Sequence, residues 1–311
     1  MRHALVTGGA GFLGSHLIDR LRKNRRVTVA DDLSTGKLTN LPPRGEADEP
    51  ITFVQLDVTQ PIAEKVMASF EPDEIYHLAC PASPVAYQRD PVKTLRTCSE
   101  GTLAVLNAAA KCGASVLLAS TSEVYGDPVQ HPQRETYWGH VNPRGPRSMY
   151  DEGKRYAEAL AAAHYVSVRV ARIFNTYGPR MAPDDGRVVS NFIVQALRGE
   201  PLTIYGDGGQ TRSLCYVDDT VAALEMLMAS DYREPVNIGN PWEVTMLELA
   251  MLVLKLTESA SKLERRPLPG DDPRRRCPDT SRANEVLKWR PLVGIDEGLA
   301  RTIRYFQEVL P

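Results

Sequence analysis

The sequence predicts an α/β protein whose core is a doubly wound parallel sheet covered by helices on both faces. Three observations support this fold class. Short apolar segments alternate with helical patterns through the first half of the chain, which is typical of βαβ units. A glycine-rich turn separates the first apolar segment from the first helix, as in Rossmann-type folds. The 311 residues, 42% of them hydrophobic, are enough for one large domain or two closely joined ones.

The first half of the chain supplies the predicted sheet. Residues 3–6 form a buried strand, and a helix of residues 12–23 follows it after the glycines. Further strands are predicted at residues 27–30, 51–55, 75–78, 116–119 and 166–170. Two long helices are predicted at residues 92–112 and 150–165. Residues 41–50 contain three prolines and several charges, which predicts an exposed loop.

The second half has a looser rhythm. From about residue 179, short strands at residues 202–205 and 236–238 alternate with helices at residues 188–198, 219–229, 247–256 and 296–309. We therefore expect residues 1–178 to form mainly the sheet domain. We expect residues 179–311 to form mainly a smaller C-terminal lobe, with some elements interleaved between the two.

Composition argues against several classes of protein. A net charge of −2 makes nucleic acid an improbable main partner. The five cysteines are an odd number without a Cys-x-x-Cys pair, which predicts reduced thiols in a cytoplasmic protein. Their spacing does not suit a metal site, so we expect no metal ligands. The sequence shows neither a signal-peptide pattern nor a long apolar run, so we expect no membrane association.

The glycine-rich turn predicts a dinucleotide site. Gly9, Gly11 and Gly14 fit the pattern G-x-G-x-x-G between a strand and a helix, where backbone N–H groups can approach a pyrophosphate. An acid at the end of the second strand, Asp31 or Asp32, should bind the ribose hydroxyls and favour NAD over NADP. Alternatively, one of these two aspartates only caps a turn.

A second acidic residue follows the third strand. Asp57, followed by Val58, could contact the adenine edge of the cofactor. Asp57 could equally serve as a helix N-cap, and the sequence leaves both interpretations open.

The catalytic prediction depends on two segments. Ser120 to Gly126 follow a buried strand, and Tyr150 and Lys154 lie one turn apart at the start of a predicted helix. A phenol has an ordinary pKa of about 10, and a nearby ammonium together with the positive ring of an oxidised nicotinamide would lower it. The pair could then remove a proton from a hydroxyl while a hydride leaves the same carbon. Glu123 places a carboxylate near this chemistry.

Several further segments carry a family resemblance. They read HPQ at residues 131–133, YWGHVNP at 137–143, GPR at 145–147, VARIFNTYGPR at 170–180, DGRVVSNF at 185–192 and DDPRRRCPD at 271–279. With the two catalytic segments, they make the chain resemble the extended short-chain dehydrogenase/reductase superfamily of nucleotide-sugar enzymes. Within it, the sequence is most similar to the UDP-glucuronate decarboxylases, also called UDP-xylose synthases. The resemblance covers nearly the whole chain.

The resemblance implies a reaction without net redox change. Tyr150, assisted by Lys154, would take the proton of the sugar 4-hydroxyl while the 4-hydride passes to NAD, and Thr121 would hydrogen-bond the same oxygen. The resulting 4-keto acid loses carbon dioxide and the hydride returns, so NAD stays tightly bound and is recycled. Glu123 and Arg276 resemble the decarboxylation residues, with the division of roles between them left open. The implied catalytic residues are Tyr150, Lys154, Thr121, Glu123, Ser122 and Arg276.

The resemblance also implies binding residues for both ligands. The expected NAD contacts are Gly8, Gly11, Phe12, Leu13, Gly14, Asp31, Asp32, Ser34, Thr35, Gly36, Asp57, Val58, Leu78, Thr97, Tyr150, Lys154 and Thr176. The expected UDP-glucuronate contacts, mainly in the C-terminal lobe, are Arg96, Asn175, Arg187, Val188, Tyr205, Gln210, Arg212 and Arg276. Arg212 would pair with the diphosphate, since a guanidinium suits bidentate phosphate recognition. Arg276 ends a run of three arginines, and such runs are usually solvated surface.

Related reactions remain as alternatives. An oxidative decarboxylase would release a UDP-4-keto-pentose and NADH. A nucleotide-sugar 4,6-dehydratase usually carries Asp-Glu where this chain has Ser122-Glu123, and a 4-epimerase usually lacks the acid. A nonenzymatic NAD-binding regulator would typically have lost Tyr150 or Lys154.

The resemblance also concerns the oligomeric state and one position at which this chain differs from the family. A homodimer is expected, in which residues 92–112 and 150–165 of two chains form a four-helix interface. The chain also departs from the family at Cys98, where asparagine is usual.

Overall fold

The computed structural model describes residues 1–42, 51–268 and 275–310. Most of the predicted loop at residues 41–50 and part of the segment at 271–279 therefore lie outside the described residues. The predicted strands and helices of the first half are present, with their ends moved by one to three residues in most cases. The strands at residues 202–205 and 236–238 and the helix at 188–198 have the predicted bounds.

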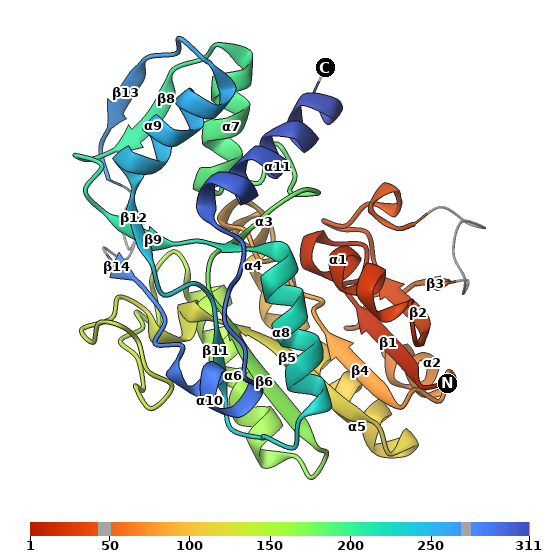
Figure 1. The fold of residues 1–311 in the computed structure, drawn as a ribbon. Coiled ribbons are helices and arrows are strands. Elements are labelled where there is room, and N and C mark those ends of the chain that lie inside the picture. The colour runs from red at the N-terminus through yellow and green to blue at the C-terminus, as the bar shows by residue number, and fades with distance from the viewer. Residues whose placement is uncertain (43–50, 269–274, 311) are drawn as a thin grey trace.

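A seven-stranded sheet forms the centre of the molecule (Figure 1). Its spatial order is β11-β6-β5-β4-β1-β2-β3, and every neighbouring pair is parallel. This is the Rossmann order with one additional strand at the edge, which confirms the predicted fold class. The strands are β1 (His3–Thr7), β2 (Arg26–Asp31), β3 (Thr52–Gln55), β4 (Glu74–His77), β5 (Ser115–Thr121), β6 (Val168–Ile173) and β11 (Val236–Ile238).

Helices cover both faces of this sheet because its strands are apolar on both sides. Along β1, Leu5 points to one face while Ala4 and Val6 point to the other, as strand geometry requires. The Leu5 face packs against α2 (Ala63–Ala68), α5 (Thr102–Cys112) and α6 (Ser148–Ala163). The opposite face packs against α1 (Phe12–Leu21) and α8 (Val217–Ala229).

The predicted single helix at residues 92–112 is wrong in one detail. The chain forms α4 (Pro91–Arg96), then a π-helical turn over Thr97–Gly101, and then α5. Apolar periodicity does not reveal such a turn, because the insertion of one residue leaves both flanking patterns intact. The short helix α3 (Pro84–Arg89) precedes this region and was not predicted.

A smaller part of the molecule lies beside the carboxyl ends of the sheet strands (Figure 1). It contains the parallel pair β8 (Leu202–Tyr205) and β13 (Leu263–Arg266) together with α7 (Val188–Arg198), α9 (Met246–Thr257) and α11 (Ile295–Val309). A second small sheet has the order β12 (Glu243–Thr245), β9 (Thr211–Ser213) and β14 (Arg275–Arg276). The remaining short elements are β7 (Thr176–Tyr177), β10 (Cys215–Tyr216), α10 (Ser281–Leu287) and 3-10 turns at Leu38–Asn40 and Ser122–Tyr125.

Two elements from the second half of the chain return to the large sheet. β11 pairs with β6, and α8 packs against β5 and β6. The chain therefore crosses between the two parts more than once. In the described part of the chain, no helix combines the length and the apolar character needed to cross a bilayer.

Candidate active site

A cavity of about 940 Å³ lies between the carboxyl ends of the sheet strands and the smaller part of the molecule. Its wall includes the glycine-rich turn, residues that follow β2 to β5, and the start of α6. Residues of α7, β8, β9 and β14 complete it from the other side. Ligands of doubly wound sheets bind at this edge, so the cavity is the candidate active site.

The glycine-rich turn has room only for glycine at Gly8 and Gly14, two of the positions that line the cavity. Gly8 has a φ of +72°, and a Cβ added there would lie 2.7 Å from the Leu78 and Ala79 backbone. A Cβ on Gly14 would lie 2.2 Å from the Gly8 carbonyl oxygen. Gly11 is the N-cap residue of α1, and no side chain accepts a capping hydrogen bond from the first N–H groups of this helix. The uncapped N–H groups and the open turn fit a dinucleotide pyrophosphate.

Gly9 has a different role from the one its motif position suggests. It does not line the cavity, and a Cβ there would lie 2.7 Å from a methyl group of Val29 and 2.9 Å from one of Ile18. Gly9 therefore permits the close packing of α1 on the sheet, whereas Gly8, Gly11 and Gly14 shape the cavity wall.

Asp31 stabilises the glycine-rich turn and the turn after β2 through hydrogen bonds from main-chain N–H groups. Its two carboxylate oxygens accept hydrogen bonds from the Ala10 N–H at 2.9 Å and from the Leu33 N–H at 2.8 Å. Burial raises the pKa of this carboxyl, although both N–H donors oppose the shift. Asp31 thus caps the turn at Leu33 and also lines the cavity, while its contact with the ribose stays a prediction.

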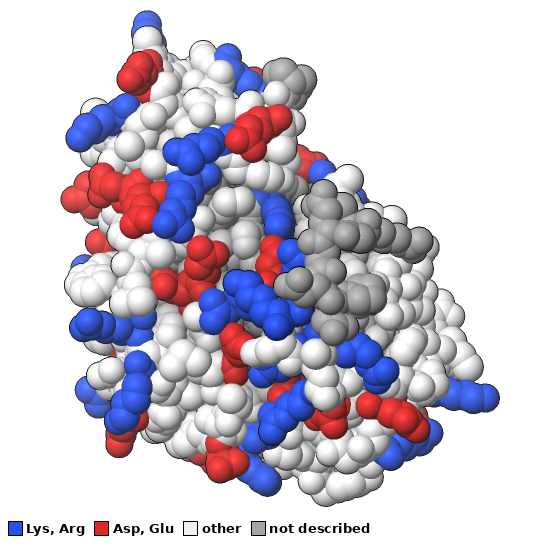
Figure 2. All heavy atoms as spheres, turned by 45° about the vertical axis from the view of Figure 1, so that its right-hand side comes forward, with Lys and Arg blue, Asp and Glu red and all other residues white. Residues whose placement is uncertain are grey.

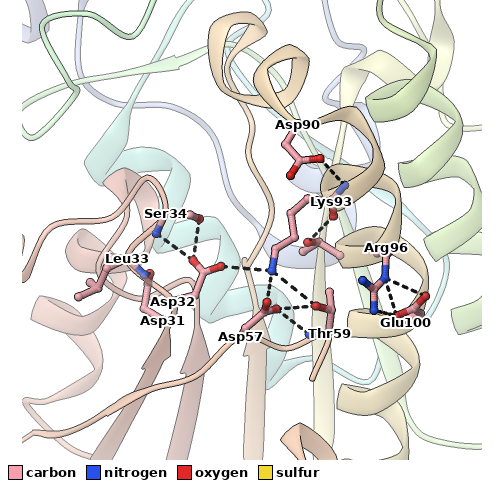
Figure 3. A network of polar contacts seen from close by, with 11 residues as sticks. Asp31, Asp32, Leu33, Ser34, Asp57, Thr59, Asp90, Lys93, Arg96 and Glu100 are labelled. Atoms are coloured by element: carbon pink, nitrogen blue, oxygen red, sulfur yellow. Dashed lines mark hydrogen bonds and ion pairs between the residues drawn. The ribbon is translucent and has the colours of Figure 1, made fainter. Parts of the chain in front are cut away.

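Asp32 and Asp57 are joined by a lysine that the sequence did not identify (Figure 3). Lys93, from α4, forms an ion pair with Asp57 and a second one with Asp32 at 3.5 Å. Asp57 also accepts two hydrogen bonds from Thr59, both at 2.8 Å, so it caps a turn. Burial would raise the pKa of Asp57, but the hydrogen bonds from Lys93 and Thr59 lower it overall. All three charged residues line the end of the cavity beside β2 and β3.

Tyr150, Lys154 and Thr121 lie together at the predicted positions. Tyr150 is in the first turn of α6 and Thr121 ends β5, and both residues line the cavity. The Lys154 ammonium donates a hydrogen bond to the Ala119 carbonyl at 2.8 Å and lies 5.9 Å from the centre of the Tyr150 ring. Main-chain bonding therefore holds the ammonium beside the phenol.

The pKa of the Tyr150 phenol is raised in the structure, whereas the sequence predicts a lowered pKa in the presence of the oxidised cofactor. Burial raises the pKa of its phenol well above the ordinary value, and the neighbouring Cys80 raises it further, while the Thr121 hydrogen bond lowers it. The predicted lowering of the pKa by a nicotinium ring remains a prediction. Tyr87, which the sequence did not identify, stacks on Tyr150 with ring centres 5.0 Å apart and planes 7° apart.

Glu123 lies between two arginines that come from distant parts of the chain. Its carboxylate contacts both N–H groups at the end of Arg276, at 2.7 and 3.0 Å. It also accepts a hydrogen bond from Arg147 at 2.7 Å. All three side chains line the cavity. Arg276 is only 6% exposed, which excludes the alternative that it is a solvated surface residue.

Arg147 was not predicted as a site residue, although it ends the segment GPR that carried part of the resemblance. Asp151 lies next to the same group of charges, and one of its carboxylate oxygens has no hydrogen-bond partner among the described residues. Burial, and then the charge of Glu123, raise the pKa of Asp151 to about 7. The arginine charges oppose this shift but do not cancel it.

Most of the other predicted contacts also line the cavity. On the cofactor side these are Phe12, Leu13, Ser34, Thr35, Val58, Leu78, Thr97 and Thr176; on the substrate side they are Asn175, Arg187, Val188, Tyr205, Gln210 and Arg212; and Ser122 lies between them. Gly36 and Arg96 are not part of the wall. Arg96 is instead paired with Glu100 on the outer side of α4, at 2.9 Å.

Charge is mixed on the face of the molecule shown in Figure 2. Lys and Arg side chains alternate there with Asp and Glu side chains, in agreement with the small net charge. The charges in the cavity come from individual ion pairs, such as that between Glu123 and Arg276.

Comparison with known proteins places this geometry in a family. Residues 4–239 match the NAD dependent epimerase/dehydratase family. The chain belongs to this family. Among curated relatives, UDP-glucuronic acid decarboxylase 1 of Arabidopsis thaliana is 52% identical over 313 residues, which span 97% of this chain and 69% of the relative. UDP-glucuronic acid decarboxylase 1 of Danio rerio is 52% identical over 99% of this chain and 73% of the relative.

Solved structures of the family have the same fold. The structure of UDP-glucose 4-epimerase with UDP-glucose from Thermotoga maritima has a TM-score of 0.90 and 33% identity, and the match covers 99% of this chain and 100% of that one. The dTDP-glucose 4,6-dehydratase DesIV from Streptomyces venezuelae, with NAD and TYD bound, has a TM-score of 0.88 and 28% identity, over 99% and 98% of the two chains. The family fold thus extends over nearly the whole chain.

Proposed function

We propose that this protein is an NAD-dependent UDP-glucuronate decarboxylase that forms UDP-xylose through a transient 4-keto intermediate. The observation that carries the proposal is the group formed by Glu123, Arg276 and Arg147 beside Tyr150 in one cavity. The guanidinium groups of Arg276 and Arg147 line the cavity, and guanidinium groups suit a substrate that brings a carboxylate of its own. The relatives named UDP-glucuronic acid decarboxylase, at 52% identity, support the same assignment.

The residues that would hold NAD fit the cofactor. Gly8, Gly11 and Gly14 leave space for a pyrophosphate at the start of α1, and Asp31 and Asp32 lie where ribose hydroxyls are expected. When bound, NAD⁺ supplies a hydride acceptor at the sugar C4 and later a hydride donor to the same carbon. In this proposal residues 1–178 mainly hold the cofactor and residues 179–311 mainly hold the nucleotide sugar.

Tyr150 would act as the base on the sugar 4-hydroxyl. Its phenolate takes the hydroxyl proton as the 4-ketone forms, and Thr121 donates a hydrogen bond to the same oxygen. The ammonium of Lys154, held by the Ala119 carbonyl, favours the phenolate form through its charge. The same proton returns from Tyr150 when the ketone is reduced again, so the enzyme ends each cycle unchanged.

Glu123 and Arg276 would act between these two proton transfers. The 4-ketone accepts the electron pair of the breaking C5–C6 bond as carbon dioxide leaves, and the enolate then takes a proton that comes from solvent at C5 as the ketone re-forms. In this proposal Arg276 and Arg147 bind the substrate carboxylate, and Glu123, which contacts both guanidinium groups, holds them in position. Ser122, which stands where a dehydratase would carry an aspartic acid, is a poor acid and therefore disfavours loss of a hydroxyl.

The deciding experiment is product analysis. Purified protein incubated with UDP-glucuronate should yield UDP-xylose and carbon dioxide without accumulation of NADH, because the hydride returns to the same sugar. Stoichiometric NADH with a UDP-4-keto-pentose would overturn this reaction in favour of the oxidative one. A C4-inverted uronate or a dehydrated sugar would favour the epimerase or the dehydratase instead.

We also propose a homodimer with a four-helix interface. Each chain contributes two long helices, namely the continuous segment from α4 through the π-helical turn to α5, and α6. These helices carry large apolar side chains that are exposed on the single chain, namely Val92, Leu95, Leu103 and Tyr156. A second copy of the chain would cover them. Light scattering should give twice the mass of one chain at micromolar concentration, and a stable monomer would refute the interface.

The odd number of cysteines supports a cytoplasmic location.

A further inference from the structure

Two cysteines contact each other at the wall of the cavity. Cys80 follows β4, and Cys98 lies in the π-helical turn between α4 and α5. Their sulfur atoms are 3.4 Å apart and share a hydrogen. The two residues are 18 positions apart in the sequence, so the tertiary structure alone brings them together.

The pair lies against the catalytic helix. Cys98 packs on Gly153, which lies between Tyr150 and Lys154 in α6, and a Cβ added to Gly153 would be 3.1 Å from the Cys98 sulfur. Cys98 is only 2% exposed, whereas Cys80 lines the cavity. A small molecule that enters the cavity would therefore reach Cys80 first, with Cys98 behind it.

The surroundings make Cys80 the more reactive thiol. The hydrogen bond with Cys98 lowers the pKa of Cys80, burial opposes this, and the charge of Lys154 lowers it further. The pKa of Cys98 is raised, first by the contact with Cys80 and then by burial. A thiolate is the nucleophilic form of cysteine, and Cys98 is placed as a resolving thiol.

We propose that Cys80 and Cys98 form a redox modification site, in which a hydroperoxide or a low-molecular-weight disulfide converts the pair to a disulfide that reversibly inhibits the enzyme. With hydrogen peroxide, the Cys80 thiolate attacks one oxygen and breaks the O–O bond, which gives a sulfenic acid and hydroxide. Cys98 then attacks the Cys80 sulfur and displaces the oxygen as water. Overall, two thiols and one peroxide give one disulfide and two waters. With a low-molecular-weight disulfide, the Cys80 thiolate attacks one sulfur and releases the first small thiol, and Cys98 then attacks Cys80 and releases the second, so two protein thiols and one small disulfide give one protein disulfide and two small thiols.

Inhibition follows from the movement that the bond requires. A disulfide bond is about 2.05 Å long, so the two sulfurs must approach by about 1.4 Å from their present 3.4 Å. Either Cys98 leaves its contact with Gly153 or Cys80 withdraws from the cavity wall. Both changes alter the support of Tyr150 and Lys154, and a displacement of about 1 Å near a reacting group can cost about 10²-fold in rate. A reductant such as dithiothreitol should restore both thiols and turnover.

The test uses the purified protein with its bound cofactor. Treatment with hydrogen peroxide, or in parallel with oxidised glutathione, should remove two of the five titratable thiols and the mass of two hydrogen atoms. Proteolytic mass mapping should then find one cross-linked peptide that joins Cys80 to Cys98. Turnover of UDP-glucuronate should fall by about 10²-fold and recover with dithiothreitol. Mapping of the cross-link does not depend on the reaction catalysed, so it separates failure of this proposal from failure of the proposed function.

Substitution of individual cysteines tests whether the Cys80–Cys98 disulfide causes the inhibition. Cys80→Ser removes the thiol that the oxidant reaches first, so its turnover should not respond to either oxidant. Cys98→Asn introduces the residue usual in the resembled family and removes the resolving thiol, so it should not form the cross-link. Cys112→Ser is the matched control: this half-buried thiol lies at the end of α5 and bonds the Ala68 carbonyl, so both the cross-link and the inhibition should persist. The proposal is overturned if the Cys80–Cys98 peptide is missing after oxidation. It is also overturned if the cross-link forms without loss of turnover, or if Cys80→Ser is inhibited to the same extent as the unmodified protein.

Discussion

Asp151 should make the stability of the protein fall as pH rises, and Asp151→Asn should remove this dependence. The side chain is 7% exposed, and its pKa is raised from 3.8 to about 7 by burial and by the charge of Glu123. Below about pH 4 the carboxyl is protonated in the folded and the unfolded protein alike. Between about pH 4 and pH 7 the unfolded chain ionises while the folded protein stays neutral, so the free energy of unfolding falls across this window and levels off above it.

The size of the effect follows from the difference in pKa. One pKa unit corresponds to about 1.4 kcal/mol, so a shift from 3.8 to about 7 corresponds to about 4 kcal/mol when the window has been crossed. Asparagine has nearly the same shape and no charge. Asp151→Asn should therefore raise the free energy of unfolding by about 4 kcal/mol at pH 8 and by about 2 kcal/mol at pH 5.

Urea unfolding of both proteins at these two pH values, at one protein concentration and saturating NAD, would measure the difference. Glu152→Gln is the matched control, because Glu152 is half-exposed and forms only a surface ion pair with Arg155 at 3.5 Å. Its effect should stay within about 1 kcal/mol at either pH. A gain from Asp151→Asn that is equal at pH 5 and pH 8, or a loss at pH 8, would refute the reasoning.

Three further predictions concern the site. Tyr150→Phe should keep the fold and bound NAD but lower turnover by about 10²–10⁴-fold, and near-normal turnover in the folded variant would exclude Tyr150 as the base. Glu123→Gln and Arg276→Ala should lower carbon dioxide release by a comparable factor of about 10² or more while substrate affinity changes much less; release at the unmodified rate would exclude the role of that residue. Gly14→Ala should weaken NAD binding by about tenfold or more, since its Cβ would lie 2.2 Å from the Gly8 oxygen, whereas Gly294→Ala, with no atom within 4 Å, should bind NAD normally.

Local features of the sequence were sufficient for the fold class. Strand periodicity, the glycine-rich turn and the helix that follows it depend on residues close together in the chain, and the prediction of a parallel sheet covered by helices followed from them. Tyr150 and Lys154 were equally predictable, because a helix places residues four apart on one face. The π-helical turn at Thr97–Gly101 was not predictable, because the hydrophobic pattern on either side of it remains that of an ordinary helix.

The tertiary structure decided which residues share the site. The contact between Glu123 and Arg276 joins positions 153 residues apart, and the family resemblance had named the two residues without predicting that they touch. Arg147, Lys93 and Tyr87 carried no spacing signal of their own. Their roles come from charges and rings that meet at the carboxyl ends of strands, where chain segments far apart in sequence converge.

The cysteine pair shows the same division. The sequence determined that this chain carries Cys98 where the resembled family has asparagine, and that the cysteines lack any motif spacing. Only the folded chain places the Cys98 sulfur 3.4 Å from that of Cys80 and against the helix of Tyr150. Sequence periodicity reports which face of an element is buried, whereas contact between two side chains depends on how separate elements pack, and that packing exists only in the complete fold.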